Sequence, residues 1–195
     1  MRHLERETLD YIPFYCEENA WRLLQRESLA GSRAWALIVS NDERRVVVLR
    51  QRSGRPVDGL VQWDYHVFVV VEDQIEGYLA LDLDSDLPFP CQLRRYVEDS
   101  FPIDLRRPLI PKFRALPARA YVLGLASDRS HMKRPDGSWL APPPPWEPPG
   151  SERKARNNLM QWTDMSLRAP GRVLSVAALR SIARSSRVGD GRLPR

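Results

Sequence analysis

The sequence predicts an α+β fold in which a leading helix packs on a mainly antiparallel sheet. Apolar residues recur at helical spacing from Cys16 onwards, at positions 16, 20, 23 and 24. Runs rich in β-branched and aromatic residues follow, separated by turn residues. Helical patterns return late in the chain, near residues 91 and 176. One helix, then strands, then further helices is the order that defines this class.

Six segments are expected to form strands. Two of them, joined by a turn at Asn41-Asp42, are adjacent in sequence, and a later pair is joined by a polar turn that ends in glycine. The predicted strands cover residues 33–41, 44–52, 63–71, 78–84, 112–126 (with breaks) and 172–175.

Helices are expected over residues 91–101, after two prolines stop the preceding strand, and over 176–185, where Ser175 is a suitable N-cap. Residues 141–151, APPPPWEPPGS, should adopt polyproline II geometry. We place a single domain over residues 1–180 and a basic, flexible tail over residues 181–195.

Composition excludes several classes of protein. The formal net charge is +5, but much of the excess lies in the C-terminal stretch, and no nucleic-acid-binding motif accompanies it. The longest apolar run, residues 67–71, is far too short to span a bilayer, and the N-terminus has no apolar signal segment. Two cysteines make no disulfide framework. We therefore expect a cytoplasmic monomer with free thiols.

Two cysteines are candidate nucleophiles. Cys16 begins a helix, where the positive end of the helix dipole lowers a thiol pKa. Glu17 and Glu18 follow directly and oppose that effect, and Cys16 also lies on the apolar stripe, as a structural cysteine would. Cys91 opens a helical segment too, so position alone does not separate the two thiols.

Two histidines compete for the role of acid and base: His66 in a strand and His131 in a loop. Side chains alternate along a strand, so a hairpin in which Val71 pairs with Gly77 would set His66 opposite Asp82 on the same face. A register shifted by two residues would set His66 opposite Asp84 instead. In the first register, a carboxylate holds one ring nitrogen and leaves the other free for a thiol.

Several motifs occur together: YCEEN, WDYHV, DLDSDLPFPC, YVEDSF, ASDRSHMK and PPPPW. Their order and spacing from Tyr15 to about Trp146 resemble the protein N-terminal glutamine amidohydrolase family. The resemblance implies that the domain is catalytic, with a papain-like fold and a cysteine–histidine–aspartate triad. Matched motif by motif, the triad is Cys16, His66 and Asp82.

The resemblance also implies the reaction. Cys16 attacks the side-chain amide of an N-terminal glutamine, ammonia leaves, and water hydrolyses the thioester to glutamate. This requires no metal or cofactor. The partners are proteins or peptides that begin with glutamine, and the product would enter an N-degron pathway. A carboxylate should bind the free α-ammonium of the substrate, and the candidates are Glu18, Asp64 and Asp128.

Two alternatives remain open. The same triad serves a papain-like protease or a transglutaminase, which would pass the thioester to an amine. The proline-rich segment also has the composition of a ligand for SH3 or WW domains, which would make the chain a non-enzymatic interaction module. Proline runs serve equally as rigid spacers within a fold, and we favour that interpretation.

Overall fold

The computed structural model describes residues 4–102, 109–184 and 193. Its main element is a six-stranded sheet with the order β6-β5-β4-β1-β7-β8, in which every neighbouring pair is antiparallel. The strands are β1 Ala34–Ser40, β4 His66–Asp73, β5 Gly77–Leu81, β6 Cys91–Gln92, β7 Lys112–Pro117 and β8 Arg172–Ser175. A separate two-stranded sheet pairs β2 (Val46–Val48) with β3 (Val61–Trp63).

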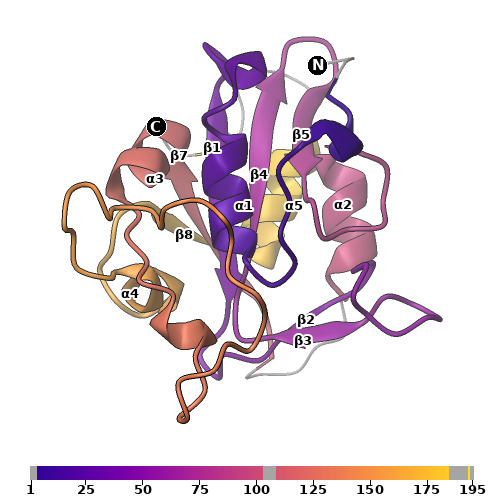
Figure 1. The fold of residues 1–195 in the computed structure, drawn as a ribbon. Helices are drawn as coiled ribbons and strands as arrows, with labels where there is room; N and C mark the ends of the chain where they lie inside the picture. The colour runs from indigo at the N-terminus through magenta and orange to yellow at the C-terminus, as the bar shows by residue number, and fades with distance from the viewer. Residues whose placement is uncertain (1–3, 103–108, 185–192, 194–195) are drawn as a thin grey trace.

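Helices cover both faces of the large sheet (Figure 1). On one face lie α1, α3 and α4, and on the other lie α2 and α5. The helices are α1 Cys16–Leu23, α2 Leu93–Ser100, α3 Ala118–Gly124, α4 Leu159–Thr163 and α5 Val176–Arg184, and the short 3-10 segments are η1 Arg6–Thr8, η2 Glu27–Leu29 and η3 Ser130–Met132. The predicted α+β class is confirmed, whereas the papain-like topology stays a prediction.

Strand alternation produces two cores. Along β1, Trp35, Leu37 and Val39 pack towards α2 and α5, whereas Ala36 and Ile38 pack towards α1, α3 and α4. All seven residues of β1 are buried, because the strand is central and covered on both faces. A near-continuous apolar run is the expected sequence signature of such a strand.

The strands formed by segments 33–41 and 44–52, which we expected to be joined by a turn at Asn41-Asp42, do not pair with each other. The two neighbours of β1 are β4 and β7, and β2 pairs with β3 instead. Asn41 explains the departure, because its side chain closes a local loop. Its Oδ1 accepts the backbone N–H groups of Glu43 and Arg45, and its Nδ2 donates to the Arg45 carbonyl. The chain therefore turns out of the sheet and does not form a hairpin.

The predicted strand over residues 112–126 is correct only in its first half. It ends as β7 at Pro117, and α3 begins at the next residue. Tyr121 of this helix is fully buried, and its hydroxyl donates to the Glu17 carbonyl in α1 at 3.0 Å. Tertiary packing against α1 thus outweighs the strand propensity of the local sequence.

The predicted hairpin register is also wrong, by two residues. In the structure Asp73 pairs with Gly77 and Val71 with Leu79, so β4 and β5 extend further towards the turn than expected. The Asp73 carboxylate accepts the backbone N–H groups of Ile75 and Glu76, which closes a shorter turn. Continuing this register would set Asp84, not Asp82, opposite His66, but β5 ends at Leu81 before that point.

The C-terminal elements follow the prediction. The Ser175 hydroxyl accepts the Ala178 N–H at 3.1 Å, as an N-cap should. Helix α5 continues past residue 180 to Arg184, and its Ile182 packs in the core. The basic tail was predicted over residues 181–195, of which 185–192 and 194–195 lie outside the described residues, so the domain boundary stays a prediction. Among the helices of the described residues, none has the length and apolar character to cross a bilayer.

Candidate active site

A pocket of about 390 Å³ lies where the start of α1, the start of β4 and the loop of η3 meet. Cys16, His66 and His131 all line it, together with two acids, Asp64 and Asp84. Its remaining walls are mostly apolar and include Phe14, Trp63, Met132, Leu140 and Ala141. Concave apolar pockets with a few convergent polar groups are where binding and catalysis occur.

His66 and Asp82 meet in spite of the shifted register. His66 Nε2 lies 3.1 Å from Asp82 Oδ2, and both side chains are buried. Because β5 has ended at Leu81, the chain beyond it is free to turn, and the Asp82 carboxylate accepts the Asp84 N–H at 3.0 Å. The predicted contact therefore arises from this local turn and not from direct cross-strand pairing.

The Asp82 carboxylate is held from several sides. Its Oδ2 accepts the Tyr96 hydroxyl of α2 at 2.8 Å and the Gln51 amide at 3.3 Å. Burial on its own would raise the pKa of Asp82, but His66, the Tyr96 hydroxyl and the Asp84 N–H outweigh it, so the pKa is lowered. Correspondingly, burial would lower the pKa of His66, but Asp82 raises it above the usual value. The pair is thus suited to stabilise a protonated imidazole.

Aromatic packing fixes the plane of the His66 ring. Trp63 stacks on it with ring centroids 6.2 Å apart and planes 18° apart, and Phe68 packs at 6.4 Å. The Trp63 indole N–H donates to Gln51 Oε1, and Gln51 also contacts Asp82. One glutamine therefore links the aromatic cover of the histidine to its carboxylate.

Cys16 is the first residue of α1 and is partly buried. Burial raises its thiol pKa well above the usual value, and the charges of Glu17 and Asp84 add to this. The lowering expected from the helix dipole is therefore outweighed. A thiol of this kind needs a base at hand to become a nucleophile. Both pocket histidines are candidates for that base.

His131 has a carboxylate of its own. Its Nε2 lies 3.4 Å from Glu17 Oε1 and 3.1 Å from the Tyr65 hydroxyl. Burial opposes protonation, but Glu17 prevails and raises the pKa of His131. The Tyr65 hydroxyl donates to Glu17 Oε2 at 3.0 Å, and the Cys16 sulfur lies 3.7 Å from the same oxygen. The structure thus brings two histidine–carboxylate pairs to one pocket.

Of the other residues that the sequence proposed for the site, most do not line the pocket. Cys91 lies on β6, buried in the core formed with α2 and α5, and does not line the pocket. Asp128 is exposed and accepts the Ser130 N–H and the Asn157 amide. Glu18 is fully buried and paired with Arg129. Only Asp64, among the three acids proposed for the α-ammonium, lines the pocket.

Glu18 holds the loop that carries His131. Arg129 donates to both Glu18 oxygens, at 2.7 and 2.8 Å, and Trp146 donates to Oε2 at 2.8 Å. Arg129 also donates to the carbonyls of Pro144 and Trp146. The proline-rich segment is therefore fastened to α1, which supports the spacer interpretation over a free ligand for another domain.

Glu18→Gln is expected to lower the free energy of unfolding by about 3–5 kcal/mol, because it leaves the Arg129 guanidinium buried without a counter-charge. Urea denaturation measures the change. Glu98→Gln is the matched control, since Glu98 forms only exposed ion pairs, with Arg94 and Arg184, which contribute little to stability. Equal effects of the two substitutions would contradict the role assigned to Glu18.

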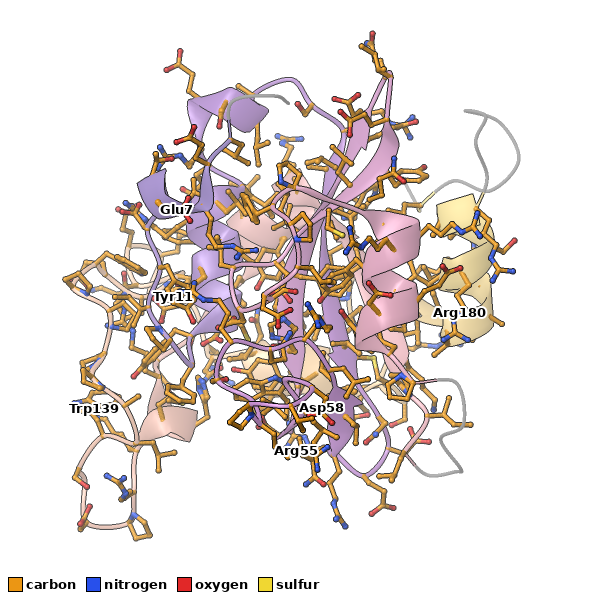
Figure 2. The ribbon with its side chains drawn as sticks, turned by 90° about the vertical axis from the view of Figure 1, so that its right-hand side faces the viewer. Glu7, Tyr11, Arg55, Asp58, Trp139 and Arg180 are labelled. Atoms are coloured by element: carbon orange, nitrogen blue, oxygen red, sulfur yellow. The ribbon has the colours of Figure 1, made fainter. Side chains whose placement is uncertain are left out.

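Asp84 is a second acid beside His66. It is 6% exposed, and its Oδ1 accepts the hydroxyl of Tyr11, a residue of the segment before α1 (Figure 2), at 2.7 Å. Burial raises the pKa of Asp84 to about 6; His66 opposes this and the charge of Asp82 adds to it. One ligand atom from each of His66, Asp82 and Asp84 fits within 4.8 Å, close enough to share an ion, but Asp82 is already engaged by protein donors.

Asp84→Asn is expected to stabilise the fold in a pH-dependent way. A carboxyl whose folded pKa of about 6 exceeds its unfolded value near 4 penalises folding once it ionises. The penalty is absent below the unfolded pKa and complete above the folded one. Removing it should raise the free energy of unfolding by on the order of 2 kcal/mol at pH 7.5 and by less at pH 4.5. Urea titrations at both pH values, with the exposed Asp86→Asn as control, measure this; an equal gain at both would contradict it.

Several residues of the site were not singled out from the sequence. Tyr65 and Tyr96 lie inside the motifs WDYHV and YVEDSF, so motif membership was a signal for them. Glu17 was considered only for its charge beside Cys16, and its contacts with Tyr65 and His131 were not predicted. Gln51 and Tyr11 lie outside every motif and reach the site through loops. No local pattern in the sequence points to them.

The pocket contains a thiol and a histidine that is paired with a buried carboxylate, an arrangement that can support thiol-dependent acyl transfer. The family model for N-terminal glutamine amidase matches residues 11–183. Curated proteins named protein N-terminal glutamine amidohydrolase from Drosophila erecta and Drosophila melanogaster are 43% identical to this chain over 144 residues, covering 71% of it and 70% of each relative. The Drosophila ananassae protein of that name is 44% identical with the same coverage. The chain belongs to the N-terminal glutamine amidase family.

Proposed function

We propose that this chain hydrolyses the side-chain amide of an N-terminal glutamine in proteins or peptides, giving glutamate and ammonia. Family membership supports the substrate and the reaction. The observation that carries the catalytic assignment is the pocket itself. It joins Cys16 to His66, and the His66 ring lies 3.1 Å from Asp82.

In the first step Cys16 attacks the amide carbon. His66 takes the thiol proton and delivers it to the departing nitrogen, so ammonia leaves and a thioester remains. Since His66 Nε2 faces Asp82, Nδ1 is the ring nitrogen available for this transfer. Asp82 holds the ring and stabilises its cation.

In the second step water attacks the thioester with His66 as base, and glutamate and the free thiol result. The negative charge that develops on the carbonyl oxygen needs fixed donors. The backbone N–H of Cys16 is one, because the first N–H groups of a helix have no intrahelical acceptor.

The setting of this reaction also belongs to the proposal. We place the enzyme in the cytoplasm, acting without a metal or cofactor and as a monomer. The glutamate product would be recognised by a transferase of an N-degron pathway, which follows from the family resemblance and not from any contact in the fold.

Matched peptides test the proposed function. We expect ammonia from a peptide beginning with glutamine, and none from the same peptide beginning with acetyl-glutamine or asparagine. Mass spectrometry separates the alternatives, since hydrolysis adds about one dalton, whereas transfer to an amine adds the mass of that amine less the roughly 17 Da of the ammonia released. Cleavage of a peptide bond, or ammonia from all three peptides, would contradict the proposal.

A further inference from the structure

We propose that Asp64 binds the α-ammonium of the substrate's first residue and so restricts the reaction to chain termini. This inference rests on the proposed function. An enzyme of that kind must distinguish a free amino terminus from an internal glutamine, whose side chain is identical. A carboxylate left unpaired in the absence of the α-ammonium provides the distinction.

The structure removes the other acids from consideration. Glu18 is fully buried and takes both oxygens to Arg129 and Trp146. Asp128 does not line the pocket. Glu17 is fully buried, does not line the pocket, and contacts Tyr65 and His131. The acids that line the pocket are Asp64 and Asp84.

These two acids differ in depth. Asp84 is nearly buried, and its carboxylate lies within 4.8 Å of ligand atoms of both His66 and Asp82, which places it at the reacting amide. Asp64 is exposed and therefore lies at the mouth of the pocket. A glutamine side chain that enters towards Cys16 leaves its α-ammonium and the rest of the peptide at that mouth. Of the two acids, Asp64 is therefore the one placed to bind the α-ammonium.

The length of a glutamine side chain also fits the span between His66 and Asp64. Four bonds of about 1.5 Å separate the amide carbon of glutamine from its α-nitrogen, so the two lie about 5 Å apart when extended. Asp64 precedes His66 by two residues, a span of at most about 7 Å. A carboxylate at this position can contact the α-ammonium while the amide lies beside His66.

Hydrogen bonds hold Asp64 in place, and the negative charge of its carboxylate is available to a substrate cation. Its backbone carbonyl accepts the Ser40 hydroxyl at 2.6 Å, and its Oδ1 accepts the Tyr65 N–H at 3.0 Å. Among the described residues, no cation forms an ion pair with it. Trp63 and Phe14, in edge contact at 6.1 Å, line the same pocket and offer aromatic faces that attract an ammonium group.

The test uses the full chain, Asp64→Asn, and two peptides. One begins with glutamine, and the other begins with its analogue that lacks the α-amino group. Wild type should prefer the first by about 100-fold in kcat/KM, and Asp64→Asn should erase most of that preference, mainly through a higher KM. Turnover of the amino-free peptide should change far less than turnover of the glutamine peptide, and circular dichroism checks that the variant is folded. Asp128→Asn is the matched control and should keep the full preference.

The outcomes are distinct. If Asp64→Asn keeps the 100-fold preference, the assignment of Asp64 is overturned and the proposed function stands. If Asp128→Asn loses the preference, the α-ammonium site lies there instead. If wild type releases no ammonia from the glutamine peptide, the proposed function is overturned and the inference about Asp64 with it.

Discussion

Cys16→Ala is expected to abolish ammonia release from a peptide that begins with glutamine. The thiol lines the pocket, and the other described cysteine, Cys91, lies in a separate core on β6. Loss of the nucleophile from such a site typically lowers kcat by about 10⁴-fold or more. A continuous assay of ammonia release, with circular dichroism as a check on folding, measures the loss.

Cys91→Ala is the matched control for this substitution. Because Cys91 is buried among apolar side chains, we expect it to lower the free energy of unfolding by about 1 kcal/mol while leaving turnover close to wild type. Full activity in Cys16→Ala would end the assignment. A folded but inactive Cys91→Ala, beside an active Cys16→Ala, would transfer the role to the other thiol.

His66→Ala is the second substitution with a large expected effect. Removing the acid and base of such a triad costs about three to six orders of magnitude in kcat. His131→Ala is a demanding control, because that ring lines the same pocket and also has a carboxylate partner, Glu17.

The contacts of the two carboxylates favour His66. Asp82 is held by Tyr96, Gln51 and a backbone N–H, as a residue that orients a catalytic ring should be. Glu17 accepts from Tyr65 and lies next to the thiol, where its charge raises the Cys16 pKa. We therefore expect His131→Ala to retain far more turnover than His66→Ala. Equal losses in two folded variants would contradict the assignment.

The sequence predicted which residues form the candidate site better than it predicted the strand register that brings them together. Cys16 at a helix start and His66 on a strand are local patterns, and both are present. The contact with Asp82 was reached through a register that does not occur. It arises because Asp73 closes a shorter turn and Asp82 leaves the ladder beyond Leu81. Side-chain hydrogen bonds in turns decide such registers, and strand periodicity does not reveal them.

In the fold, too, features set by local sequence patterns were predicted and features set by long-range contacts were not. The fold class and the leading helix follow from the spacing of apolar residues along the sequence. The start of the last helix follows from Ser175, which caps it. The placement of β2 beside β3, and the change from strand to helix after Pro117, depend on partners far away in sequence. The fastening of the proline-rich segment to Glu18 is likewise a tertiary contact between residues 128 positions apart. Patterns within one segment cannot predict such contacts.

The most direct test of the account is interception of the thioester on Cys16 by hydroxylamine. Hydroxylamine attacks a thioester to give a hydroxamate and the free thiol, in competition with water. Mass spectrometry of the glutamine peptide should then show two products, one heavier by about 1 Da and one by about 16 Da, the second growing with hydroxylamine concentration. Cys16→Ala should give neither. Turnover that yields only the lighter product at every hydroxylamine concentration would contradict the thioester mechanism.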